Sequence, residues 1–177
     1  MDSREQLIEQ MLILRCQMGD KDAFANLIER YQRPLRYFIS RLLDDAQASE
    51  DILQDTWLTV IGRISGLKKP EAFSIWLYRI ARNKVYQRLR RKKVWSELNE
   101  NITAPNDIED EAMSLENVAK VHECLKKLRA EHKEVLMLRF LEQMSYQQIS
   151  EVLDCNPGTV RSRVYYAKRA LKKEMEK

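Results

Sequence analysis

Two stretches of this 177-residue chain place basic, amide and aromatic side chains at helical spacing, a combination suited to contact with nucleic acid. In the first stretch, steps of four, three and four align four residues on one helix face: Arg79, Asn83, Tyr86 and Arg90. Cations there can neutralise phosphates, the amide can hydrogen-bond a base edge, and the ring can stack on a base. Between Arg79 and Lys93 there are eight Lys or Arg residues and no acid, which favours nucleic-acid contact over simple solvation.

The second stretch lies near the C-terminus, on the outward face of a helix predicted to begin at Pro157. That face carries Gly158, Arg161, Ser162, Tyr165 and Arg169, and Arg163 and Lys168 flank it. Gly158 lets the backbone approach DNA closely, Arg161 can bridge guanine O6 and N7, and Ser162 can bond to a base edge or a phosphate. The flanking cations are better placed for phosphates.

The elements around this face have the pattern of a helix-turn-helix. Ser145 and Gln148 form a capping-box pattern at the start of a first helix. Residues 154–156 make the turn, Asn156 is a suitable N-cap, and Pro157 fits the first helical position. Apolar residues of the second helix recur at steps of four, three and four and are expected to be buried: Val160, Val164, Ala167 and Leu171. Residues 121–144 supply two further amphipathic helices that could buttress the pair.

The positions upstream predict a helical domain under the first basic face. Apolar residues recur at helical spacing between Phe24 and Leu42, with a kink or break expected at Pro34. In residues 50–64, one helix face is expected to be buried: Leu53, Trp57, Val60, Ile61 and Ile64. In residues 76–89, a second buried face is expected: Trp76, Leu77, Ile80, Ala81, Val85 and Leu89.

The far side of the helix in residues 50–64 carries Asp51, Gln54 and Asp55 within about one turn. Two interpretations stay open from these residues. The group is either an ordinary solvated face or a docking surface for a basic partner.

Composition limits the fold and the class of protein. With 44% hydrophobic residues but only 4 Gly and 4 Pro, the chain is predicted to be all-α, because all-β folds need many turn residues. Three distant cysteines argue against a disulfide framework. There is no cleavable leader pattern and no apolar run long enough for a membrane span, so we expect a soluble, cytoplasmic protein.

Charge divides the chain into two domains. Between Ser96 and Ala119 there are seven Asp or Glu residues and no base, whereas Arg161 to Lys173 has six bases and no acid. The acidic stretch lacks an apolar period and contains Pro105, which predicts a linker. We therefore expect an N-terminal helical domain at 1–94, an acidic linker at 95–114 and a helix-turn-helix domain at 115–177.

Four segments, in this order, resemble the extracytoplasmic-function (ECF) sigma factors of bacterial RNA polymerase: GDKDAFANLIERY, EDILQDTWL, FSIWLYRIARNK and MSYQQISEVLDCNPGTVRSRVYYAKRAL. The resemblance implies a sigma domain 2 followed by a sigma domain 4. Asp154 stands where members often have a turn glycine, and Asp tolerates the left-handed conformation better than most residues.

The resemblance also implies roles for particular residues. Asp51, Gln54 and Asp55 would bind the clamp helices of the polymerase core. The minus-10 element would contact a loop and the helix after it, through Leu67, Lys68, Lys69, Phe73, Arg79, Asn83, Tyr86 and Arg90. The loop would capture a base flipped from the non-template strand. The minus-35 element would contact Gly158, Thr159, Arg161, Ser162, Arg163, Tyr165, Tyr166 and Arg169.

The resemblance implies core polymerase, promoter DNA and an anti-sigma factor, often membrane-anchored, as partners, and places the acidic linker in the RNA exit channel. No enzyme activity, metal or cofactor is expected.

One alternative function is that of a self-sufficient helix-turn-helix regulator, although no dimerisation seam is present. Another is a nucleic-acid enzyme, but His122, Cys124, His132 and Cys155 match no standard zinc spacing.

Overall fold

The computed structural model describes residues 3–43, 45–98 and 116–177, and the elements in these ranges are helical. The N-terminal bundle consists of α1 (Ser3–Gln17), α2 (Lys21–Leu42), α3 (Ala46–Arg63) and α4 (Phe73–Leu98), with short 3-10 turns at Ile64–Gly66 and Pro70–Ala72. The C-terminal unit consists of α5 (Glu116–Lys126), α6 (Ala130–Leu136), a π-helical segment (Met137–Leu141), α7 (Tyr146–Leu153) and α8 (Pro157–Met175). The all-α prediction is confirmed.

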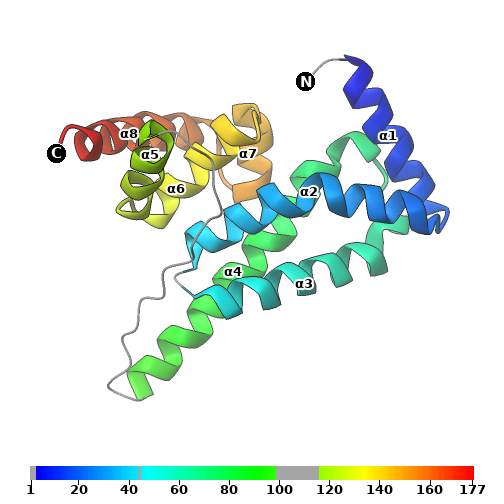
Figure 1. Cartoon of the computed structure of the whole chain (residues 1–177), viewed down its shortest axis with the longest axis horizontal. Helices are drawn as coiled ribbons and strands as arrows, with labels where there is room; N and C mark the ends of the chain where they lie inside the picture. Colours follow the sequence, from blue (N-terminus) through cyan, green and yellow to red (C-terminus); the bar gives the residue numbers. More distant parts are fainter. Residues whose placement is uncertain (1–2, 44, 99–115) are drawn as a thin grey trace.

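In the N-terminal bundle, α2 and α3 lie side by side and α4 crosses them (Figure 1). Aspartates cap the N-termini of α2 and α3, since Asp20 accepts a hydrogen bond from Ala23 N and Asp45 accepts one from Ala48 N, each at 3.0 Å. The core is formed by fully buried aromatic and aliphatic side chains from all four helices, among them Ile13, Leu27, Phe38, Val60 and Tyr78. Phe38 and Tyr78 pack edge-on with ring centroids 5.2 Å apart.

Helix α2 continues through Pro34, so the break expected there does not occur. Proline removes one backbone hydrogen bond and crowds the preceding turn. However, Leu27, Tyr31, Leu35 and Phe38 on both sides of it are buried in one core. Packing of this continuous apolar face outweighs the local cost of the proline.

Two further sequence expectations need correction. Ile61 was expected in the core but is 48% exposed, whereas Ile52 and Thr56 are buried. The buried face of α3 is therefore rotated toward Ile52, and the Thr56 hydroxyl is satisfied by donating to the Ile52 carbonyl at 2.7 Å. Helix α1 was not predicted, and it covers the bundle with Ile13 and Cys16 while Tyr31 donates a hydrogen bond to its buried Glu9.

The C-terminal unit packs against the N-terminal bundle. Helix α7 lies along α4, and α6 contacts α2 (Figure 1). Helix α4 extends to Leu98, past the expected domain boundary at residue 94, and the rest of the predicted linker lies mainly outside the described residues. None of the helices in the described ranges is long and apolar enough to cross a membrane.

Candidate nucleic-acid and partner interface

The predicted helix-turn-helix is confirmed in its local details. The Ser145 side chain accepts a hydrogen bond from Gln148 N, and the Gln148 side chain accepts one from Ser145 N, which completes the capping box at α7. Asp154 ends α7 in the left-handed conformation, with φ 53° and ψ 52°. Asn156 then caps α8 by accepting from Gly158 N at 2.8 Å, and Pro157 occupies the first turn. The turn is thus specified residue by residue.

Helix α8 is held by buried Val160, Val164 and Ala167, and Leu171 is half-buried. Its opposite face carries the eight predicted minus-35 residues: Gly158, Thr159, Arg161, Ser162, Arg163, Tyr165, Tyr166 and Arg169. Seven of these residues are exposed, and Arg163 is half-buried. The structure therefore brings these eight residues together on one accessible side of a single helix.

Contacts within this face order some of its side chains. The rings of Tyr165 and Tyr166 meet edge-on at 5.3 Å, and the Arg169 guanidinium lies 5.8 Å from the Tyr165 centroid. The Ser162 hydroxyl donates to the Gly158 carbonyl at 3.1 Å, so it keeps acceptor capacity for a partner. Arg163 lies at the edge, 3.7 Å from Glu131 of α6.

The first basic face lies on α4 and is less uniform. Arg79, Asn83 and Arg90 are exposed, whereas Tyr86 is half-buried. The Arg82 guanidinium lies 4.6 Å from the Tyr86 ring centroid, and Tyr86 lies close to the Glu134 carboxylate of α6. Burial first, and the Glu134 carboxylate second, raise the pKa of Tyr86 to about 12. Tyr86 is therefore neutral and partly covered by the C-terminal unit.

The loop between α3 and α4 is fixed from α1. Gln17 Nε2 donates to the carbonyl of Ile64 at 3.0 Å and to that of Leu67 at 2.7 Å. Lys68 and Lys69 are exposed and Leu67 is half-buried, so these side chains are accessible to a ligand. Phe73 is not accessible: it is fully buried and packs edge-on against Tyr31 at 5.4 Å. The structure places Phe73 in the core under the loop rather than on a contact surface.

The acidic face of α3 is open, since Asp51, Gln54 and Asp55 are all exposed. Lys84 of α4 approaches Asp55 at 3.9 Å, but the Asp55 side chain stays 66% exposed. Leu58 and Ile61, exposed by 67% and 48%, extend this face with apolar area. Sequence analysis missed Leu58, although its position four residues after Gln54 places it on the same side.

A metal site receives no support from the geometry. In the described part of the chain, no group of three or more His, Cys, Asp or Glu side chains is arranged to hold a metal ion. Cys16 and Cys124 are buried and Cys155 is half-buried. Burial raises the pKa of the Cys16 thiol, and the nearby Asp20 carboxylate adds to that rise.

Comparison with known proteins supplies the family. The model described as Sigma-70 region 2 matches residues 27–94, and the one described as Sigma-70, region 4 matches residues 119–171. RNA polymerase sigma-H factor of Pseudomonas aeruginosa is 34% identical, covering 95% of this chain and 94% of that protein. ECF RNA polymerase sigma-E factor of Haemophilus influenzae is 32% identical over 97% of both chains. The chain belongs to the ECF sigma factor family.

Two solved structures share the fold of this chain. The RpoE sigma factor of Bartonella quintana, solved with the anti-sigma factor NepR, matches with a TM-score of 0.77 and 22% identity over 86% of this chain and 96% of its own. CnrH, solved with the cytosolic domain of CnrY, matches with a TM-score of 0.69 and 22% identity, covering 95% of this chain and 97% of CnrH. In this sigma factor, α3 and most of α4 fall within the region 2 match, and most of α8 falls within the region 4 match.

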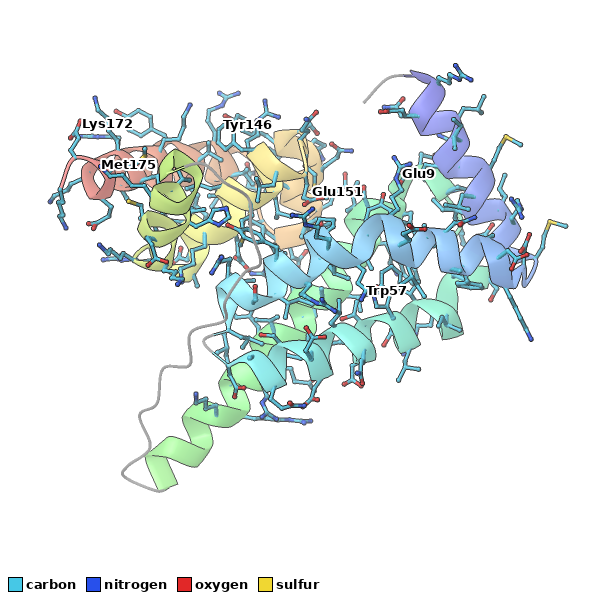
Figure 2. The ribbon with its side chains drawn as sticks, viewed as in Figure 1. Glu9, Trp57, Tyr146, Glu151, Lys172 and Met175 are labelled. Atoms are coloured by element: carbon cyan, nitrogen blue, oxygen red, sulfur yellow. The ribbon has the colours of Figure 1, made fainter. Side chains whose placement is uncertain are left out.

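The C-terminal unit of the sigma factor also contains an apolar groove of about 440 Å³. It lies between α5, the π-helical segment and the end of α8, and its lining includes Leu125, Phe140, Leu141, Leu171 and Met175. Lys168 and Lys172 stand at its edge. Figure 2 shows Lys172 and Met175 at the end of α8 that points away from the N-terminal bundle.

Proposed function

We propose that this chain is a dissociable ECF sigma factor that binds core RNA polymerase, recognises minus-35 and minus-10 promoter elements and promotes DNA melting. One observation carries the proposal: two separate helices, α4 and α8, each bury one side and expose a cationic, hydrogen-bonding face on the other. Two such faces in one chain fit two promoter elements contacted by a single protein. Catalysis of RNA synthesis belongs to the polymerase.

Helix α8 is the proposed minus-35 element reader. Its exposed Arg161 can make a bidentate contact to guanine, and the neighbouring Ser162 hydroxyl can accept or donate at a base edge. Tyr165 and Tyr166 add rings that can contact thymine methyl groups or sugars. Arg163, at the edge of the face, suits a phosphate.

The loop before α4 and the exposed part of α4 are the proposed minus-10 site. Arg79 and Arg90 can neutralise phosphates, and Asn83 between them offers an amide to a base. Extruding a base from the stack costs a few kcal/mol, so its acceptor must be pre-ordered. The two hydrogen bonds from Gln17 support that role for the loop at Leu67. Phe73 would contribute by supporting the loop from beneath.

The exposed face of α3 is the proposed contact with core polymerase. Asp51, Gln54 and Asp55 can pair with a basic helix surface, while Leu58 supplies apolar area at their centre. The acidic linker, with six Asp or Glu residues between 95 and 114, is proposed to lie in the RNA exit channel, where its negative charge would face basic walls.

An anti-sigma factor is the proposed regulatory partner. The sigma factor RpoE, which has the same fold, was solved in complex with the anti-sigma factor NepR, and CnrH was solved with the cytosolic domain of CnrY. The open apolar groove on the C-terminal unit supports the proposal, because an exposed hydrophobic depression of this kind suits an amphipathic helix.

The test is transcription in vitro with purified bacterial core polymerase and a library of promoter fragments. We expect transcripts only when the protein is added, from fragments that share paired minus-35 and minus-10 sequences. Asp51→Ala/Asp55→Ala should reduce core binding without altering duplex DNA binding, and Asp22→Ala, an exposed acid on α2, is the matched control. Silent core polymerase together with tight duplex binding by the free protein would instead establish a self-sufficient DNA-binding regulator.

A further inference from the structure

The two units of the sigma factor meet along a contact that none of the proposed DNA and polymerase interactions requires. Helix α7 lies along α4, and α6 contacts α2 (Figure 1). Across the same boundary, the ring of Tyr37 in α2 lies 5.2 Å from that of His122 in α5. The C-terminal unit therefore covers part of the helix that carries the proposed minus-10 face.

An ion pair lies inside this contact. Arg82 Nε of α4 donates to Glu134 Oε1 of α6 at 3.0 Å, and the two side chains are only 20% and 1% exposed. Tyr86 of α4 lies close to the same carboxylate, which adds to burial in raising the Tyr86 pKa. Burial raises the pKa of Glu134, and the Arg82 charge opposes that rise. Arg82 of α4 is thus the cation that compensates the buried carboxylate.

A second glutamate approaches the same bundle from the end of the π-helical segment. Glu142 lies next to Gln143, which has a left-handed backbone with φ 53°. The segment is fixed by Met144 N donating to the Leu138 carbonyl at 3.0 Å and by Arg139 donating to the Met144 carbonyl at 2.8 Å. Glu142 faces the buried Tyr78, whose pKa is raised well above its ordinary value, first by burial and then by this carboxylate.

The contact also buries two tyrosine hydroxyl groups. Within the described residues, the buried hydroxyls of Tyr37 and Tyr78 make no hydrogen bond of ordinary geometry. Both tyrosines lie where the N-terminal bundle meets the C-terminal unit. Separation of the two units can therefore expose these two hydroxyls to solvent without breaking a hydrogen bond that they make to the described residues.

We propose that Arg82 and Glu134 form a latch that holds the free sigma factor closed, with the C-terminal unit keeping Tyr86 and the adjacent part of α4 from promoter DNA. The claim about DNA rests on the proposed function of the α4 face. The closed arrangement itself does not. Binding to a promoter would require the latch to open, releasing Arg82 and Tyr86 and exposing the Glu134 carboxylate to water.

The latch predicts an asymmetry between its two partners. Replacing Arg82 leaves the 1% exposed Glu134 carboxylate inside the contact without its cation, which is strongly unfavourable. Replacing Glu134 leaves Arg82, which is 20% exposed and can turn toward solvent. Replacing both with apolar residues of similar length removes the buried charge altogether, which can be close to neutral.

The direct test measures closure without DNA or polymerase. Donor and acceptor dyes are attached to the full chain through Met18→Cys, at an 86% exposed site on the bundle, and Lys172→Cys, at a 78% exposed side chain on α8. Cys155→Ser removes the half-buried native thiol, whereas Cys16 and Cys124 are buried. At pH 8 we expect Arg82→Met to lower the transfer efficiency by shifting the open-to-closed ratio about tenfold to 100-fold.

Two further variants separate a latch from general damage. Arg82→Met/Glu134→Met should regain most of the transfer efficiency that Arg82→Met loses. Glu131→Met is the matched control, because Glu131 lies one turn earlier on α6 and pairs with Arg163 inside the C-terminal unit. It should leave the transfer unchanged. Equal transfer in Arg82→Met and the parent protein, or no recovery in the double variant, would overturn the latch.

A second measurement tests the consequence for DNA. The probe is single-stranded DNA from the non-template minus-10 region of a promoter recovered in the transcription library. If closure limits binding, Glu134→Lys, which places a second cation against Arg82 and so opens the contact, should tighten the apparent Kd several-fold by raising the competent fraction, and Glu131→Lys, with the same charge change, should not. Opening without tighter binding would retain the latch and remove its effect on DNA. Failure to support transcription would count against the proposed function alone.

Discussion

Gln17 Nε2 and the carbonyl oxygen of Leu67 are joined by a 2.7 Å hydrogen bond across 50 residues of sequence. The same amide group donates to the Ile64 carbonyl at 3.0 Å. Helix α1 therefore fixes the backbone of the loop that enters α4. This contact gives α1, which lies before the region 2 match at residues 27–94, a direct connection to the proposed minus-10 site.

Replacing Gln17 with alanine should loosen this loop without disturbing α8. Removing a donor from two carbonyls is expected to cost about 1–2 kcal/mol of folding stability. We also expect slower open-complex formation with unchanged affinity for minus-35 duplex, measured by permanganate footprinting and by duplex binding. Gln6→Ala, an exposed glutamine on the same helix, is the control. Equal opening rates for the two variants would remove Gln17 from loop ordering.

Asn83→Ala should impair promoter opening while sparing core binding. Asn83 is exposed on α4 between Arg79 and Arg90, so its amide is available to a base and contributes little to the core of the bundle. Core affinity can be measured by titrating labelled sigma factor with polymerase, and opening by fluorescence of a base analogue in the minus-10 region. Unaltered opening by Asn83→Ala would contradict the assigned role.

Arg161→Ala should weaken minus-35 discrimination by roughly 1–3 kcal/mol, because one bidentate base contact is lost. Affinities for cognate and mismatched duplexes, measured at one salt concentration, give this difference directly. Lys173→Ala removes a cation from the exposed last turn of α8 and serves as control. Lys173→Ala should lower the affinity for cognate and mismatched duplexes by the same factor. An unchanged preference in Arg161→Ala would exclude Arg161 from base recognition.

Closure of the two units should strengthen as pH falls from 8 to 5. Burial raises the pKa of both Glu134 and Glu142 above the ordinary value of 4.5. A carboxyl with a raised pKa in the closed state binds its proton more tightly there. Its contribution to closing is therefore complete below 4.5 and is lost as pH rises through the raised pKa.

Dye transfer between the two units, followed from pH 8 to pH 5, measures this dependence. The charged or titratable groups around Glu134 are Arg82, Tyr86 and Arg163, and Tyr78 faces Glu142. Glu134→Gln/Glu142→Gln should flatten the profile. The pKa of Glu123 in α5 is shifted in the opposite direction, because Lys126 lowers it. Glu123 therefore stays ionised from pH 8 to pH 5 and does not contribute to the profile. A profile that the double variant leaves unaltered would assign the pH effect to other groups.

The helix-turn-helix could be predicted in detail because its determinants are local. The capping box at Ser145, the left-handed turn at Asp154 and the cap at Asn156 each depend on residues within a few positions of one another. The exposed face of α8 followed from helical periodicity alone. The ECF family assignment rested in the same way on contiguous motifs, and it is confirmed.

The errors have tertiary causes. Pro34 is tolerated because the two halves of α2 share one core, which local propensity does not reveal. Ile61 is exposed because α3 faces the bundle with Ile52 instead. Glu134 has the sequence context of a solvent-facing helix residue, and only the approach of α4 makes it 1% exposed. Phe73, expected at a contact surface, is buried by α1 and α2 packing around the loop.

The way α7 and α8 are joined has an evolutionary consequence. The turn between these helices is formed by left-handed Asp154 and the α8 N-cap Asn156, and α8 is anchored by buried Val160, Val164 and Ala167. None of these side chains belongs to the exposed face proposed to contact DNA. Substitutions on that face can therefore alter promoter choice while the frame stays constant. Such a division would let duplicated copies of one gene diverge to new regulons by a few surface changes, with no intermediate that fails to fold.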